Sequence, residues 1–186
     1  MGKMKVRTKQ HISVLEEIRR TGRYVVDPKH AAADYEGFRE MALQVYDWLA
    51  GNCTIADKKP ADAVYPVWVS VTDETVQPRE KDYVIFELEA DESDVCLVNI
   101  GKWGMMLNFS YIPRDEADDK RHKKLLEDCG VSDAKAFMSR FYPEIKAEIT
   151  ESWHRLFDES ILPVNSDCYG IIWEIREERI LNIHGL

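Results

Sequence analysis

Alternation between apolar and polar residues in two central segments restricts the fold of this chain more than any other feature of its sequence. Residues 65–72, YPVWVSVT, put three valines on one face of a strand and Trp68 and Ser70 on the other, because strand side chains alternate between faces. Residues 82–90, DYVIFELEA, repeat the pattern. Further strands are predicted at 6–11, at about 95–100 and in the closing segments YGIIWEIRE and RILNI.

Helical periodicity fills much of the chain between these strands. A capping box, Ser13 with Glu16, predicts a helix over 14–21 that Gly22 ends. Strands in two groups around helices predict an α+β fold, a mixed and largely antiparallel sheet with helices packed on it. The length predicts a single domain, 1–186, with a helical insert at about 101–160 between the strand groups. Other helices are predicted at 35–50, at 115–128 and from Pro143.

The charge balance bears on location and partners. With 34 acidic and 25 basic residues the net charge is −9, which disfavours nucleic acid as a partner. Residues 1–30 hold eight Lys or Arg and three acids, so this basic end either receives a phosphate-bearing ligand or is a solvated face. No apolar run approaches the roughly 20 residues of a membrane helix. Because the N-terminus also lacks the apolar core of a secretory signal, we expect a cytoplasmic protein without a membrane partner.

Cysteine and histidine spacing argues against a metal centre. The cysteines are far apart and lack a CxxC pair, which favours reduced thiols over a disulfide framework or a zinc site. The five histidines are scattered, and none has helical ligand spacing to another. Nucleotide-binding glycine loops and the usual hydrolase signatures are absent as well. We therefore predict no metal site, and no motif fixes a reaction.

Two pairs of polar residues in predicted strands are candidates for a ligand site. In VRTKQH (6–11), Thr8 and Gln10 occupy the face that should meet the core. They either satisfy backbone groups at the following turn or form the floor of a pocket. Trp68 and Ser70 share a face of a central strand, where they either line a pocket or pack in the core.

Three further residues carry open alternatives. Asn108, in an otherwise apolar segment, either braces a loop backbone or contacts a ligand. Arg155, in ESWHRLFDES, either grips a phosphate or pairs with Glu151, while Trp153 is a core anchor in the second case. Glu174, flanked by apolar residues, needs a cation or an opening to solvent.

Several segments together resemble one family. These are Thr8-x-Gln10, YDWLA (46–50), YPVW (65–68), FELE (86–89), KWGMMLN-x-x-YIP (102–113), SWHRLFD (152–158) and WEI (173–175). They resemble, in order and over nearly the whole chain, an uncharacterised bacterial family, domain of unknown function 3841. The resemblance implies no established reaction.

A fold-level analogy supplies the first functional hypothesis. A polar first strand, a helix ended by glycine and a late-strand glutamate are similar to the layout of ADP-ribosyltransferase-like domains. That likeness implies a nucleotide- or NAD-handling pocket, a transferase reaction with Glu174 as the catalytic residue, and ligand contacts from Thr8, Gln10, Trp68 and Ser70, with Arg7 or Arg155 for phosphate. The alternative is a non-enzymatic protein-interaction module in which these residues are structural and the acidic body meets a basic partner. The oligomeric state stays open.

Overall fold

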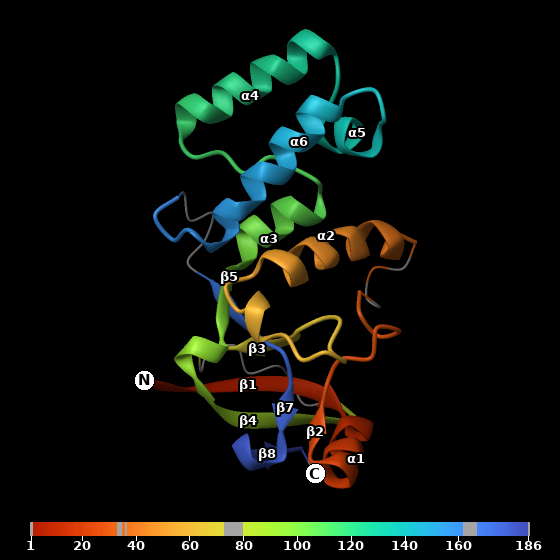
Figure 1. Cartoon of the computed structure of the whole chain (residues 1–186), viewed down its shortest axis with the longest axis vertical. Helices are drawn as coiled ribbons and strands as arrows, with labels where there is room; N and C mark the ends of the chain where they lie inside the picture. The colour runs from red at the N-terminus through yellow and green to blue at the C-terminus, as the bar shows by residue number, and fades with distance from the viewer. Residues whose placement is uncertain (1, 33–34, 36, 73–79, 162–166, 186) are drawn as a thin grey trace. The chain divides into compact units, whose positions relative to one another are not determined.

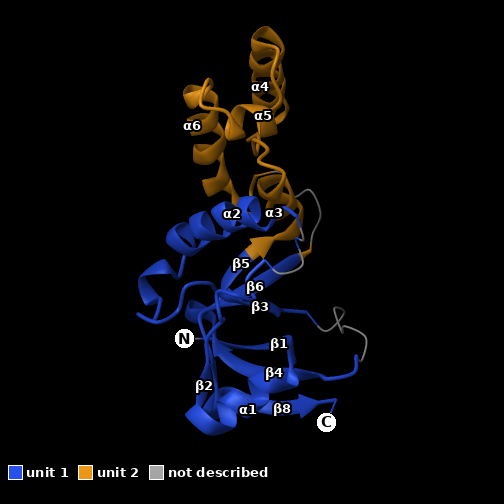
Figure 2. Ribbon diagram, turned by 90° about the vertical axis from the view of Figure 1, so that its right-hand side faces the viewer, with its two compact units in different colours: residues 1–97, 168–186 blue, residues 98–167 orange. Residues whose placement is uncertain are grey.

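The computed structural model describes residues 2–32, 35, 37–72, 80–161 and 167–185 (Figure 1). The chain divides into two compact units, coloured separately in Figure 2. Unit 1 comprises Met1–Leu97 and Cys168–Leu186, and unit 2 comprises Val98–Asp167. The helical insert predicted at about 101–160 lies inside unit 2.

A six-stranded sheet of order β5-β6-β3-β1-β4-β8 is the main element of unit 1. Neighbouring strands pair antiparallel at β1–β3, β1–β4, β3–β6 and β4–β8. A separate two-stranded sheet joins β2 (Arg23–Tyr24) to β7 (Ile175–Arg176). The α+β prediction is confirmed. The strands of the large sheet are β1 (Lys3–His11), β3 (Val67–Ser70), β4 (Tyr83–Asp91), β5 (Cys96–Asn99), β6 (Cys168–Ile172) and β8 (Ile180–His184).

Helix α1 (Ile12–Thr21) covers one face of this sheet and buries Val14, Leu15 and Ile18 in the core. Its predicted end is confirmed, because Gly22 adopts a left-handed φ of 80°. The predicted Ser13 cap is wrong. The helix begins two residues earlier, at Ile12, because the His11 side chain accepts a hydrogen bond from the Ser13 backbone N–H and takes the capping position. The sheet residues of this core are Val6, Val67, Val69, Val84, Phe86, Leu88, Ala90 and Ile172.

The rest of unit 1 is built on helix α2 (Arg39–Asn52), which begins later than the predicted residue 35. The Tyr65 hydroxyl donates to Asp47 of α2 at 2.8 Å, and this ties the helix to the segment before β3. Short 3₁₀ turns complete the unit: η1 (Ala56–Lys58), η2 (Glu92–Asp94) and η4 (Glu177–Arg179).

The segment YGIIWEIRE does not form the one strand that its sequence predicts. β6 ends at Ile172 and β7 starts at Ile175, and the two strands belong to different sheets. At the break, the Trp173 indole N–H donates to the Ile55 carbonyl at 2.7 Å. The chain therefore changes sheets at residues 173–174, which puts Glu174 outside both strands.

Unit 2 is helical and contains an aromatic core. Phe137 stacks on Phe109 with ring centroids 4.5 Å apart and on Trp153 at 5.2 Å, and Trp153 is 1% exposed, as predicted for a core anchor. The helix predicted from Pro143 begins there but is α-helical only to Ser152. Among the described residues, no helix has the length and apolar character needed to span a membrane. The elements are α3 (Ile100–Leu107), α4 (Glu116–Cys129), α5 (Asp133–Met138), α6 (Pro143–Ser152) and η3 (Trp153–Phe157).

Candidate functional site

The two polar pairs predicted to share a pocket lie on opposite faces of the large sheet. Arg7 of β1 stands directly opposite Ser70 of β3 in the antiparallel register. Paired residues project to the same face, and alternation sends Thr8 to the other one. Trp68, two residues before Ser70, shares the Arg7 face. The sheet therefore separates Thr8 and Gln10 from Trp68 and Ser70.

Thr8 and Gln10 engage each other on the core face. Thr8 is 5% exposed and lies next to the buried Val6. The Gln10 side-chain amide donates to the Thr8 hydroxyl at 2.8 Å. Because each residue satisfies a polar group of the other, their presence on an apolar face has a structural explanation.

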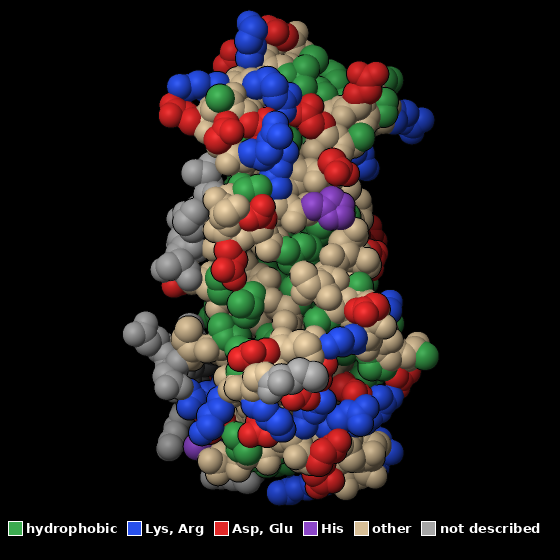
Figure 3. Space-filling view, turned by 60° about the vertical axis from the view of Figure 1, so that its left-hand side comes forward, with side chains coloured by type: hydrophobic (Ala, Val, Ile, Leu, Met, Phe, Trp, Pro, Cys, Tyr) green, Lys and Arg blue, Asp and Glu red, His purple; other side chains and the backbone are tan. Residues whose placement is uncertain are grey.

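The opposite face carries a ladder of charges. Its buried member, Glu87, is 8% exposed, and the neighbouring cations hold the pKa of this carboxyl below its usual range although burial acts to raise it. Figure 3 likewise shows Lys and Arg side chains interleaved with Asp and Glu on the surface it presents. The basic strand is thus compensated by acids of neighbouring elements. The ion pairs of this ladder are Lys3–Glu89 at 2.6 Å, Lys5–Glu87 and Arg7–Glu87 at 3.4 Å, and Lys9–Glu80 at 2.5 Å.

Glu174, the predicted catalytic residue, is clamped between two arginines. Its two carboxylate oxygens lie 2.7 Å from Arg23 Nη1 and 2.6 Å from Arg176 Nε. Arg23 and Arg176 stand directly opposite each other in the β2–β7 pair, where like charges repel. The two arginines supply the cations that Glu174 needs between its apolar neighbours. The Glu174 carboxylate in turn offsets the repulsion between the two arginines.

Asn108 and Arg155 also make intramolecular contacts, in unit 2. The Asn108 side-chain amide donates to the Gly104 carbonyl at 2.8 Å, so it braces the end of α3. Arg155 lies 3.1 Å from Asp118 and donates to the Ile112 carbonyl. The partner of Arg155 is thus Asp118 rather than the predicted Glu151, because α6 ends at Ser152 and Arg155 lies in the 3₁₀ turn η3, where residues four apart do not share a face.

Asp118 is the centre of the densest polar cluster among the described residues of unit 2. Its side chain is 3% exposed and accepts hydrogen bonds from the Tyr111 hydroxyl at 2.8 Å and from Arg121 at 3.0 Å, in addition to Arg155. The Arg114 backbone N–H donates to it as well, at 3.0 Å. Burial alone would raise the pKa of Asp118, but these donors outweigh it and hold the pKa far below its usual range. Asp118 is therefore a buried anion with a full set of donors.

His122 lies beside this cluster and faces two carboxylates. Its Nε2 is 2.7 Å from Asp133 Oδ1 of α5, and its Nδ1 is 3.1 Å from Glu148 Oε1 of α6. The ring stacks on Tyr111 at 4.0 Å and the residue is 3% exposed. Burial lowers the pKa of His122, but the two carboxylates outweigh that effect and the pKa lies above its ordinary value. The buried ring therefore joins α4 to α5 and α6.

Lys102 is a buried cation of α3 that the sequence did not single out. It is 2% exposed, and its ammonium group donates to the carbonyls of Arg155 at 3.0 Å and Asp158 at 2.6 Å. Backbone carbonyls at the end of a helical turn carry partial negative charge, which stabilises the ammonium group. Lys102 thus caps the η3 turn.

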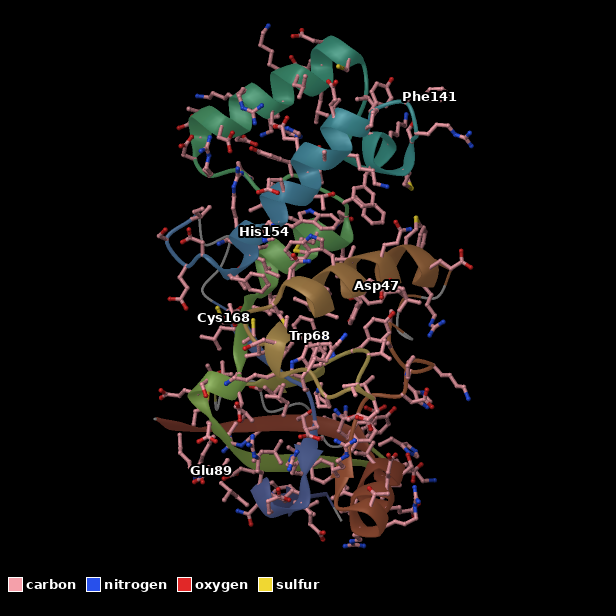
Figure 4. The ribbon with its side chains drawn as sticks, viewed as in Figure 1. Asp47, Trp68, Glu89, Phe141, His154 and Cys168 are labelled. Atoms are coloured by element: carbon pink, nitrogen blue, oxygen red, sulfur yellow. The ribbon has the colours of Figure 1, made fainter. Side chains whose placement is uncertain are left out.

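The turn between α5 and α6 presents the most exposed large apolar side chain of the described residues. Phe141 is 82% exposed and Met138 is 57% exposed. Figure 4 labels Phe141 at this turn. The Phe141 backbone N–H donates to the Ser139 hydroxyl at 3.0 Å, and the neighbouring Phe137 is 5% exposed in the aromatic core. We call residues 138–141 the apolar turn.

Metal and thiol chemistry find little support in the described part of the chain. No group of three or more His, Cys, Asp or Glu residues is placed there to hold a metal ion. All four cysteines are free thiols, as predicted, and burial raises the pKa of Cys53 to about 11. A thiol with a raised pKa is a poor nucleophile at neutral pH.

The sequence-based candidates missed Asp118, His122, Lys102 and the apolar turn. For Asp118 and His122 the sequence offers one signal, the polar helix DEADDKRHKKLLED. This helix lacks an apolar stripe, so polar contacts must attach it to the rest of the fold.

Comparison with known proteins identifies a family and no activity. A family model described as "Domain of unknown function (DUF3841)" matches residues 5–181. No curated protein and no solved structure matches the chain.

Proposed function

The chain belongs to the DUF3841 family, and we propose that it is a non-enzymatic protein-interaction module that binds an acidic, amphipathic segment of a partner through the apolar turn. The observation that carries the proposal is the 82% exposure of Phe141 on a turn fixed by its own hydrogen bond. Exposed apolar side chains that lie together on a folded surface mark interaction sites.

The residue types of the apolar turn are those that interfaces favour. Phe, Met and Arg are enriched at protein–protein contacts, and Phe141, Met138 and the exposed Arg140 stand within four positions of one another. Aromatic stacking of the buried Phe137 holds the turn in place, which reduces the entropy that binding must overcome.

Charge around the apolar turn selects the partner. The exposed charged residues on either side are Lys135, Arg140 and Glu144, which sum to +1. The half-buried Lys146 lies over the Phe137 ring at 4.4 Å, and the half-buried Asp133 and Glu148 of the same stretch both face His122. The whole chain has a net charge of −9, so this cationic neighbourhood differs in sign from the protein as a whole. An acidic segment with an apolar stripe complements both features.

The placement of the predicted pocket residues supports a module over an enzyme. Thr8 pairs with Gln10, Asn108 with Gly104 and Arg155 with Asp118. Glu174 is held by two arginines. Each has a structural role that accounts for its presence without a ligand.

Fluorescence anisotropy with two labelled helical peptides tests the proposal. The peptides have equal length and leucine content, with glutamate at the polar positions of one and lysine at those of the other. We expect saturable binding of the glutamate peptide, weakened about tenfold or more by Phe141→Ser and by Met138→Ser. Phe38→Ser, at a residue 65% exposed in unit 1, is the matched control and leaves binding unchanged.

Three results contradict this assignment. They are the absence of binding to either peptide, equal binding by the Phe141→Ser variant, and a preference for the lysine peptide. The last result would favour a basic partner on the acidic body instead.

Nucleotide handling is a second candidate, supported by one observation. Arg7, Ser70 and Trp68 share a face of the sheet, so a phosphate-bearing aromatic ligand would meet a cation, a hydroxyl and an indole there. Such a ligand would compete with Glu87, which lies 3.4 Å from Arg7, and with the Thr72 carbonyl, which accepts from the Ser70 hydroxyl at 2.9 Å. Such a ligand would not contact Thr8 or Gln10. A thermal-shift screen with NAD and mononucleotides tests it, and a stabilisation that Arg7→Gln and Trp68→Ala abolish would favour it over the module.

A further inference from the structure

Helix α4 differs from the other helices in what it buries. Its fourteen residues bury only Asp118 and His122, whereas α6 buries Ile145 and Ile149. Leu125 and Leu126 are half-buried. The exposed side chains of α4 are charged, and several form ion pairs with a residue four positions along the helix. These pairs are Glu116–Lys120, Asp119–Lys123 and Lys124–Asp128. Polar contacts thus provide most of the attachment of α4 to the rest of unit 2.

The hydrogen-bonding pattern requires His122 to be protonated in this arrangement. A neutral imidazole donates from one nitrogen and accepts at the other, whereas an imidazolium donates from both. Both ring nitrogens face carboxylate oxygens, of Asp133 at 2.7 Å and of Glu148 at 3.1 Å. Two acceptors opposite the ring are satisfied together only by the cation.

The cations of the cluster are unevenly placed around its three carboxylates. Arg114, Arg121 and Arg155 all pair with Asp118, and Arg121 also pairs with Glu148. His122 is the cation that faces Asp133, and it shares Glu148 with Arg121. Loss of its proton removes the cation that faces Asp133, at a contact that joins α4 to α5 and α6.

We propose that α4 is a releasable helix, which separates from α5 and α6 when the His122 imidazolium loses its proton. The groups that face His122 are Asp133 from α5 and Glu148 from α6, with the Tyr111 ring stacked on it. Asp118 and Arg121 lie beside it on α4, and Arg155 of η3 contacts Asp118. The α5–α6 contact persists after release, because Ala136, Phe137, Ile145 and Ile149 bury apolar surface. This inference does not depend on the proposed partner.

Amide hydrogen exchange of the full chain, corrected for the intrinsic pH dependence of exchange, tests the release. We expect the protection of residues 116–129 to fall with rising pH, by up to about tenfold per pH unit between the pKa of His122 in the released helix and its higher pKa in the packed one. Residues 143–152 keep their protection. His122→Gln removes the pH dependence, whereas His154→Gln, at an exposed histidine of the same unit, leaves it unchanged.

A second variant and a second readout keep the proposal open to refutation if His122→Gln does not fold. Glu148→Gln gives a neutral ring a partner on each side and therefore weakens the pH dependence. Histidine ring NMR of the wild-type chain reports the charge on His122 directly. A neutral ring at pH 6, or simultaneous loss of protection in 116–129 and 143–152, would overturn the release of α4.

Discussion

Arg7 stands directly opposite Ser70 across β1 and β3, and this single register assigns every side chain of the two strands to a face. Thr8 therefore joins the core that α1 covers, while Trp68 joins the charged face. A ligand held by Thr8 and Trp68 together would have to contact both faces of a sheet. For this reason we propose an interaction surface elsewhere, on the apolar turn.

Replacing Glu174 by Gln should lower stability without acting through a reaction. The variant leaves Arg23 and Arg176 opposite each other without a shared carboxylate. We expect the urea midpoint to fall. For Glu178→Gln, at an exposed residue that lies 3.6 Å from Arg176, the urea midpoint should fall less. Equal urea midpoints for the two variants would show that the contacts of Glu174 with the two arginines do not stabilise the fold.

Replacing Lys102 by Met should destabilise the chain by about 1–3 kcal/mol, because two backbone carbonyls lose the donor that is buried against them. The carbonyls belong to Arg155 and Asp158. Lys120→Met is the matched control, at a side chain 72% exposed, where an exposed ion pair contributes about 0.5 kcal/mol or less. Urea unfolding followed by circular dichroism measures both.

Replacing Asp118 by Asn should destabilise the chain by about 3–5 kcal/mol, the cost of breaking a buried ion pair from one side. The neighbouring Asp119→Asn removes the same charge at a side chain 34% exposed and should cost about 1 kcal/mol or less. A similar loss of unfolding free energy in both variants would show that the cluster around Asp118 stabilises the fold no more than an exposed ion pair does.

Acid should destabilise unit 2 through the same carboxylates. Hydrogen bonds and cations hold the pKa of Asp118 and of Glu148 below their ordinary values, against burial. A depressed pKa gives stability that is present above the unfolded pKa, roughly 4, and is lost as pH falls through the folded value. Hydrogen exchange of residues 116–129 between pH 6 and pH 3 should therefore accelerate relative to the intrinsic rate, and Asp118→Asn should reduce that effect.

Replacing Gly170 by Ala should cost about 1–3 kcal/mol through overpacking. A Cβ at Gly170 would lie 2.8 Å from methyl carbons of both Val69 and Val95. A Cβ added at Gly51, in α2, would meet no atom within 4 Å beyond its own stretch of helix, so Gly51→Ala should be neutral or stabilise by up to about 1 kcal/mol. Thermal unfolding of the two variants should shift in opposite directions or differ clearly in size.

Local sequence signals predicted elements well where the contacts involved are local. Gly22 ends α1 and Pro143 begins α6 because their backbone preferences act at those positions, and the buried Trp153 follows from helical spacing. The α+β class follows from alternation in the central strands.

Relations between distant elements were not accessible in the same way. Alternation gives the two faces of β1 and of β3, but only the register Arg7–Ser70 shows which faces coincide. The partners of Asp118 lie on separate segments, at Tyr111 and Arg155, and the pairing depends on how α4 packs. The strand predicted across 169–177 is interrupted because Trp173 and Glu174 find distant partners.

The interaction surface is tested most directly by two-dimensional NMR of the full chain titrated with the glutamate peptide. We predict that the amide shifts of residues 135–144 change in a saturable manner, and that the corresponding shifts disappear in the Phe141→Ser variant. Shift changes confined to residues of β1 and β3, or none at all, would contradict the account.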